Sequence, residues 1–145
     1  MKRIMMLSMM TGVLALTGCS TLNNVFGNDT TGMHDVKATA SNTAPVKSMN
    51  GMLVDSKDNM TLYTFDKDMM ANKSDCGAAC SVAWPAFMAP SNAKASGQFN
   101  AFQREDGMYQ WAMNGKPLYF YANDTNVGDM DGDGKGGVWH IVKTK

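Results

Sequence analysis

The sequence predicts a mainly β fold: a small single domain of two related β-hairpin repeats with a final strand and one short helix, preceded by a signal peptide and flexible tether. Three observations predict it. Short β-prone runs are separated by Asn, Gly and Asp, these runs recur 56 residues apart, and an apolar N-terminal segment ends at a cysteine. We therefore expect a signal peptide in residues 1–18, a lipidated cysteine and tether in 19–47, and the repeat domain in 48–145.

The N-terminal segment has the layout of a signal peptide. Two basic residues precede an apolar run over residues 4–16, which is too short to be a permanent membrane span. Residues 16–19, Leu-Thr-Gly-Cys, resemble the lipobox of bacterial lipoproteins, in which the cysteine receives a diacylglycerol before cleavage. The resemblance implies lipidation at Cys19 and, because Ser20 follows it instead of Asp, sorting to the outer membrane. An ordinary signal peptide that happens to end beside a cysteine is the alternative.

The remaining chain has the size and charge of one ordinary exported domain. Removing residues 1–18 of 145 leaves 127 residues, enough for a single core. The 13 basic residues include Lys2 and Arg3, so 11 remain against 13 acidic ones, and nucleic-acid binding is not expected. Residues 20–47 are rich in Asn, Thr, Ser, Gly and Ala and have no apolar period, which predicts a tether. The membrane is the one partner predicted, through the N-terminal lipid, while a protein or small-ligand partner is left unidentified.

A motif of the form Tyr-x-aromatic-x-x-Asp occurs twice. Its residues are Tyr63, Phe65 and Asp68 in the first copy and Tyr119, Tyr121 and Asp124 in the second. Asn114-Gly115 lies between two apolar runs and predicts a hairpin turn, and Asp58-Asn59 falls at the same place in the first copy. Gly51-Met52 likewise recurs as Gly107-Met108. Each motif predicts two aromatic rings on one face of a strand, followed by a carboxylate that accepts hydrogen bonds from turn amides.

Two further elements complete the predicted fold. The segment from Cys76 to Pro85 is the one with helical character, and its proline should end the helix. Residues 138–142 alternate in polarity and predict the final strand, which follows a Gly- and Asp-rich loop over residues 128–137.

These features resemble the bacterial predicted lipoproteins that have a repeated Tyr-x-(Phe/Trp/Tyr)-x-x-Asp motif, a family also called the secreted repeat of unknown function. The likeness covers roughly residues 50–142, including the paired cysteines before Trp84-Pro85 and the run from Gly137 to His140. It implies the class and the location of the protein. Because the family has no established activity, the resemblance implies no reaction.

Cys76 and Cys80 are the thiols that remain once Cys19 is lipidated, and an exported chain lies where disulfides form. Four residues apart on a helix puts Cα atoms about 6 Å apart, which a disulfide tolerates. We expect a structural disulfide. The alternative is a periplasmic copper-binding or thiol redox protein, because this spacing also occurs in exported copper chaperones; His140, His34 and methionines would then supply further ligands.

Asp129, Asp131 and Asp133, followed by Gly134, match the first half of a calcium-binding loop. His140 stands where an EF-hand would have its bidentate glutamate, so that type of site is excluded. A weak calcium site and a simple turn both fit the sequence. Apart from this possible calcium and the copper of the alternative above, no cofactor is predicted.

No catalytic residues are predicted. The sequence holds no Ser/His/Asp order, phosphate-binding loop or paired-carboxylate spacing that would indicate an enzyme. The hypothesis is therefore an outer-membrane-anchored lipoprotein whose domain is a non-catalytic binding or structural module of the cell envelope.

Overall fold

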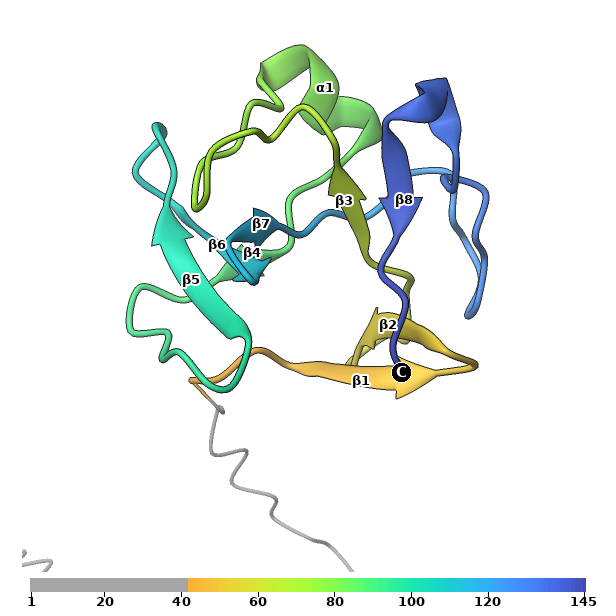
Figure 1. Ribbon diagram of the computed structural model, residues 1–145, viewed down its shortest axis with the longest axis horizontal. Helices are drawn as coiled ribbons and strands as arrows, with labels where there is room; N and C mark the ends of the chain where they lie inside the picture. Colours follow the sequence, from red (N-terminus) through yellow and green to blue (C-terminus); the bar gives the residue numbers. More distant parts are fainter. Residues whose placement is uncertain (1–41) are drawn as a thin grey trace, which may run out of the picture. The chain divides into compact units, whose positions relative to one another are not determined.

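The computed structural model describes residues 42–145 (Figure 1). The signal peptide, Cys19, His34 and most of the expected tether lie outside these residues. The described chain is mainly β with one short α-helix, as the sequence predicts. Its elements are β1 (Val46–Met49), β2 (Met52–Asp55), β3 (Tyr63–Phe65), α1 (Ala78–Ala83), β4 (Met88–Ala89), β5 (Phe99–Gln103), β6 (Tyr109–Met113), β7 (Lys116–Pro117), the 3-10 helix η1 (Lys135–Gly137) and β8 (Trp139–Ile141).

The first repeat begins with a hairpin that is not among the elements predicted from the sequence. Strands β1 and β2 are antiparallel and are joined by Asn50-Gly51, whose φ angles of 51° and 80° are those of a type I′ turn. Strand β1 starts at Val46, within the last residues assigned to the tether. The chain then turns, Thr61 bridges back to Val54, and β3 follows.

The second repeat has the same order of strands. Strand β6 lies between β5 and β4 and also pairs with β7 across Asn114-Gly115. The φ angles of this pair are 51° and 80°, so the predicted hairpin turn is confirmed.

The 56-residue offset holds for the motif strands but not for the first hairpin of each repeat. Met52 bridges Lys143, and Gln110 bridges Met88 in the corresponding way, so Gln110 is the structural counterpart of Met52. Two residues separate Met52 from its partner on β1, whereas residues 103–109 separate Gln110 from its partner on β5. The second hairpin is thus the longer one. Gly51-Met52 and Gly107-Met108 are not equivalent positions, because the two turns differ in length.

The two repeats exchange strands with each other. The backbone N–H of Tyr63 donates to the oxygen of Tyr119 at 2.8 Å, and the N–H of Tyr119 donates back to Tyr63 at 3.0 Å. Strand β3 of the first repeat pairs with β8 at the end of the second, and the two lie side by side in Figure 1. Correspondingly, Tyr119 of the second repeat forms a β-bridge with Ala86, near the end of the first repeat. Each motif strand is therefore hydrogen-bonded to the other repeat.

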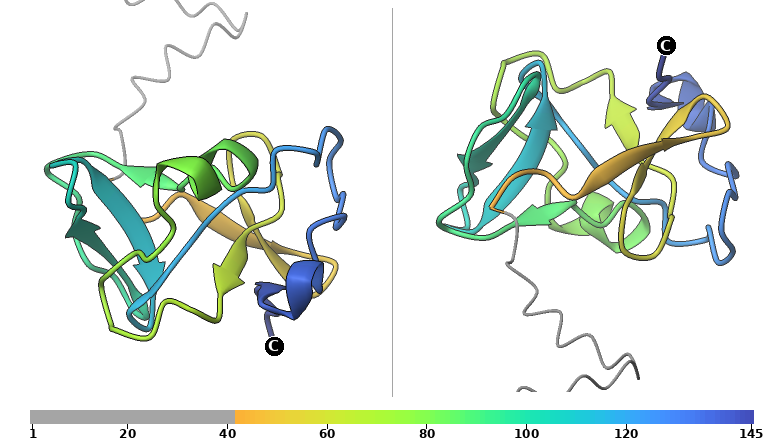
Figure 2. Two further views of the ribbon diagram at one scale, coloured as in Figure 1. Left: turned by 90° about the horizontal axis from the view of Figure 1, so that it is seen from above. Right: turned by 90° about the horizontal axis from the view of Figure 1, so that it is seen from below.

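The hydrophobic core draws equally on the two repeats. One of its two clusters consists of Leu53, Leu62, Phe87, Trp111, Leu118 and Val142, and the other of Tyr63, Cys76, Trp84, Tyr119 and Trp139. Helix α1 ends at Ala83, ahead of Pro85, as predicted. In both views of Figure 2 the β5 and β6 hairpin lies on one side of the domain, and β8 with η1 lies on the opposite side. Between residues 42 and 145, no helix has the length and apolar character that a membrane span requires.

Candidate functional site

The motif tyrosines and aspartates bond to each other across the repeats. The Tyr63 hydroxyl donates to Asp124 Oδ2 at 2.5 Å, and the Tyr119 hydroxyl donates to Asp68 Oδ2 at 2.8 Å. The second oxygen of each carboxylate accepts a backbone N–H seven residues further along, from Asp75 at 2.7 Å and from Asp131 at 3.0 Å. Each aspartate therefore ties a loop of its own repeat to a tyrosine of the other.

Burial changes the acidity of these groups. Both tyrosine side chains have 0% of their surface exposed. Burial, followed by the hydrogen bond to Asp124, raises the pKa of Tyr63 far above its ordinary value, and burial likewise raises the pKa of Tyr119. Burial also raises the pKa of Asp68 and of Asp124, against the lowering effect of their hydrogen bonds. Both hydroxyls consequently remain protonated donors.

The aromatic residues form a stack of four rings. Trp84 and Trp139 lie face to face, with ring centroids 3.8 Å apart and planes 3° apart. Phe65 stacks on the outer side of Trp139 at 4.2 Å, and Tyr121 lies on the outer side of Trp84 at 4.5 Å. Each ring thus has its counterpart in the other repeat. Tyr63 and Tyr119 meet the stack edge-on, at 5.4 Å from Trp84 and 5.2 Å from Trp139 respectively.

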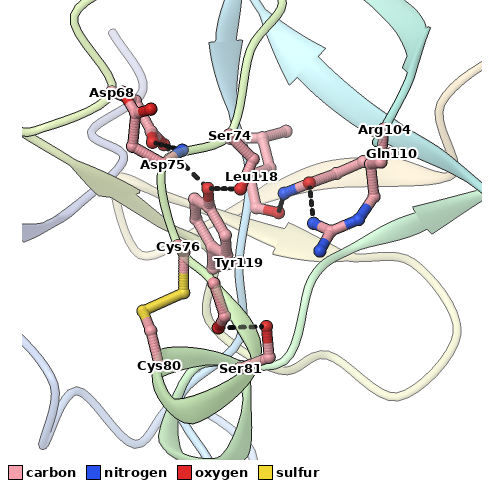
Figure 3. The surroundings of a disulfide bond; sticks show 11 residues. Asp68, Ser74, Asp75, Cys76, Cys80, Ser81, Arg104, Gln110, Leu118 and Tyr119 are labelled. Carbon is pink, nitrogen blue, oxygen red and sulfur yellow. Dashed lines mark hydrogen bonds between the residues drawn. A yellow bond between two sulfur atoms is a disulfide. The ribbon is translucent and has the colours of Figure 1, made fainter. Parts of the chain in front are cut away.

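Cys76 and Cys80 form a disulfide with Cα atoms 5.2 Å apart (Figure 3). The bond joins the residues just before α1 to its first turn, and Cys76, with 2% of its surface exposed, packs in the same cluster as Tyr119 and Trp139. Gly132 occupies the corresponding place in the second repeat. A Cβ on Gly132 would lie 2.8 Å from Trp84 and 2.9 Å from Tyr63, so only glycine fits there.

The Asp-rich loop does not gather its carboxylates as one ligand set. Asp129 accepts the N–H groups of Thr125 and Asn126, and these bonds lower its pKa. Asp133 accepts the N–H of Ile141 at 3.0 Å. Among residues 42–145 no group of three His, Cys, Asp or Glu side chains has the arrangement of a metal site. Calcium binding by Asp129, Asp131 and Asp133 stays a prediction.

His140 lies on β8 opposite Thr64 of β3, and its Nε2 is 2.8 Å from Asp66 Oδ2. Both side chains are about half exposed. Cys76 and Cys80 are joined as a disulfide, so neither sulfur is a free thiolate in the described chain. Copper binding by the reduced pair with His140 stays a prediction.

A cavity of about 690 Å³ lies between α1 and the long β5–β6 hairpin. One wall comes from the loop around Ser74, Cys76 and α1, and the other from Met88 of β4, Phe102, residues 103–106 and Met108. Sequence reasoning missed this site. The signal was Asp106-Gly107, a hairpin-turn pair that marks the tip of the longer hairpin.

Arg104 lines this cavity with 14% of its side chain exposed, and Figure 3 shows its hydrogen bond to Gln110. Its Nη1 donates to Gln110 Oε1 at 2.5 Å, and its Nε donates to Asp106 Oδ2 at 3.2 Å. Gln110 is fully buried and donates from Nε2 to the oxygen of Leu118 at 2.8 Å. The guanidinium is therefore fixed by a buried amide that is itself fixed by the backbone.

Comparison with known protein families identifies the family of this chain. A family described as a secreted repeat of unknown function matches residues 45–88 and residues 100–143. The two matched segments correspond to the two repeats that exchange strands. Neither the curated proteins nor the solved structures contain a match to this chain.

Proposed function

Since the chain belongs to the family of secreted repeats of unknown function, we propose that it is a lipoprotein of the cell envelope. Cys19 carries the lipid, the outer membrane is the destination, and the domain is a non-catalytic binding or structural module. Family membership supports an extracellular or envelope location, and the lipobox at residues 16–19 supports the anchor.

One observation favours a non-catalytic role: the residues that define the repeated motif are used to hold the repeats together. Tyr63 and Tyr119 are fully buried and bonded to Asp124 and Asp68. A tyrosine and a carboxylate at this separation would suit proton transfer if a substrate could reach them. Here burial keeps both hydroxyls away from solvent and raises the pKa of each, so neither is suited to act as a general acid or base near neutral pH.

The anchor is tested by metabolic labelling of cells with a palmitate analogue, followed by membrane fractionation. The parent chain should be labelled and should sediment with the membranes, whereas Cys19→Ala should be unlabelled and released. The matched control is a double Cys76→Ser, Cys80→Ser variant, which also loses cysteine but should still be labelled. Labelling of Cys19→Ala would contradict the proposal.

The non-catalytic role is tested on protein extracted from envelopes in its native state. Denaturation should release any small molecule that copurifies with the domain. Its mass should equal the mass of the same molecule in the cell extract, because a binding domain leaves its ligand chemically unchanged. Steady consumption of a molecule by the purified protein, with a product of different mass, would overturn this part of the proposal.

A further inference from the structure

We infer that the cavity between α1 and the β5–β6 hairpin binds a small organic monocarboxylate with an apolar body, and that Arg104 holds the carboxylate. This inference rests on the proposed binding role of the domain and gives that role a ligand class.

The cavity lies where the two repeats differ. The stretch 103–109 lengthens the second hairpin, while the corresponding turn of the first is only Asn50-Gly51. The opposite wall, α1 with its disulfide, has as its counterpart only the three residues of η1. In the other half of the domain Met49 packs on Gly128, with its methyl 3.7 Å from where a Cβ of that glycine would lie. The features unique to each repeat thus face each other across the cavity.

The chemistry of the cavity also departs from that of the other repeat. Gln110 stands where the first repeat has the apolar Met52, although both positions are buried. A buried amide costs free energy unless its hydrogen bonds are made. Gln110 makes them to Leu118 and Arg104, and it thereby holds a guanidinium in a site with little solvent. Core packing alone does not require this pair, since a methionine serves at the equivalent place.

Two of the three guanidinium nitrogens of Arg104 donate to side chains of the described residues. Among the described residues its side-chain hydrogen bonds go to Gln110 and Asp106, from Nη1 and Nε. Nη2 thus remains for a ligand, and a planar carboxylate is the group that arginine binds best. Lys73, Glu105 and Asp106 also line the cavity. Both cations of the lining already have a carboxylate nearby, since Lys73 Nζ lies 3.9 Å from Asp75 and Arg104 Nε lies 3.2 Å from Asp106. With Glu105 added, the lining has no net positive charge that would favour a ligand with several negative charges. The ligand should therefore carry a single carboxylate.

The remaining lining fits an apolar body. Met88 and Phe102 lie on either side of Gln110 in the sheet, and Met108 also lines the cavity. Methionine side chains adapt to irregular apolar shapes. A volume of about 690 Å³ is within the usual range for small-ligand sites.

The test is a titration of the full chain carrying Cys19→Ala, labelled with ¹³C at the methionine methyl groups and observed by NMR. The probe is decanoate, kept below its micelle-forming concentration, with decanol as the uncharged analogue. We expect decanoate to shift the Met88 and Met108 methyl signals, and decanol to bind at least about tenfold more weakly, because it loses the charge-assisted hydrogen bond. A second probe, an N-acetylated leucine dipeptide compared with its amide, distinguishes a peptide carboxyl end from a fatty acid.

Arg104→Gln should weaken decanoate binding by about tenfold or more, and Lys57→Gln, the same charge change on a side chain outside the cavity, should leave it unchanged. Gln110→Met introduces the residue of the first repeat, so it should fold and still weaken binding by releasing the guanidinium. Equal binding of decanoate and decanol, unchanged affinity of Arg104→Gln, or no shift of either methyl signal would each overturn the inference. None of these results bears on labelling at Cys19, so the failure of the ligand and the failure of the anchor are distinguishable.

Discussion

Tyr63 of the first repeat and Asp124 of the second share a hydrogen bond of 2.5 Å, and Tyr119 and Asp68 share its counterpart of 2.8 Å. The motif that repeats along the chain is thus a pair of complementary halves. The tyrosine hydroxyl of each copy donates its hydrogen bond to the aspartate carboxylate of the other copy.

Removing one member of a pair should destabilise the domain. We expect Tyr63→Phe, Tyr119→Phe, Asp68→Ala and Asp124→Ala each to lower the free energy of unfolding by about 1–3 kcal/mol, because a buried partner is left unsatisfied. Chemical denaturation measures this. Tyr121→Phe is the control, since its hydroxyl only accepts an exposed bond from Asn123 and its loss should have little effect.

The partnership itself is tested by double-mutant cycles. Tyr63→Phe should couple to Asp124→Ala, and should be nearly additive with Asp68→Ala, although Asp68 belongs to its own repeat. Coupling within a repeat and additivity between repeats would contradict the structure.

The pH dependence of stability should carry the signature of these carboxylates. Burial raises the pKa of Asp68 and Asp124 in the folded protein, so the folded state binds more protons than the unfolded state at a pH between the ordinary carboxyl value of about 4 and the raised values. Stability from these groups falls as the pH rises through that window. The difference in melting temperature between the parent and an Asp68→Asn, Asp124→Asn variant should therefore widen in the parent's favour on acidification. Effects of Asp106 and Asp129, whose pKa values are lowered, are present in both proteins and cancel.

The face-to-face pair of Trp84 and Trp139 should be visible by circular dichroism. Two indole rings with centroids 3.8 Å apart should couple their electronic transitions and give a paired positive and negative band in the far ultraviolet. Trp84→Phe or Trp139→Phe should each abolish it. Trp111 belongs to the other core cluster, so Trp111→Phe serves as the control that retains the couplet if the domain stays folded.

Gly132 and Gly77 offer a matched pair of glycine substitutions. Gly132→Ala puts a methyl group against Trp84 and Tyr63 and should cost about 1–3 kcal/mol of stability through overpacking. Gly77 has a φ of −74° and no atom within 4 Å of an added Cβ, so Gly77→Ala should be neutral or slightly stabilising. Equal melting temperatures for the two variants would show that the contact at Gly132 is not as tight as described.

The disulfide decides between a structural and a copper-binding pair of cysteines. Cys76 is shielded from solvent, so we expect the bond to resist glutathione and to titrate below about −300 mV, as structural disulfides do. Cu(I) affinity of the reduced parent should then match that of a Cys76→Ser, Cys80→Ser variant. A much higher affinity of the reduced parent, together with a more oxidising potential, would favour the copper or thiol redox alternative.

Much of the fold could be predicted because single turns, helix ends and strands are specified by a few neighbouring residues. Asn114-Gly115 specifies a type I′ turn, Pro85 ends α1, and the alternation around Trp139 specifies the final strand. The hairpin at Asn50-Gly51 carries the same local signal and was predictable in principle.

The tyrosine partners of Asp68 and Asp124 were not predictable in this way. The spacing of Tyr63 and Asp68 is identical in the two copies, so it suggests two independent units, and only the exchange of β3 and β8 shows that each unit is completed by the other. The cavity was hidden for a related reason. The first hairpin of the second repeat is longer than that of the first repeat, and the turn that follows it is shorter. The two differences nearly cancel, so the motifs recur at a constant offset of 56 residues and Gly51-Met52 aligns with Gly107-Met108 although the two positions are not equivalent.

The exchange of strands between the repeats has a consequence for a chain half this length. One repeat alone would leave the Tyr63 hydroxyl without its carboxylate, Trp84 without its stacking partner and the edge of β3 unpaired. A second copy of the same unit would supply all three by two-fold symmetry. We therefore expect a gene encoding a single repeat to make a homodimer. The present chain has the architecture of such a dimer joined end to end, with the longer hairpin in one half and the disulfide in the other.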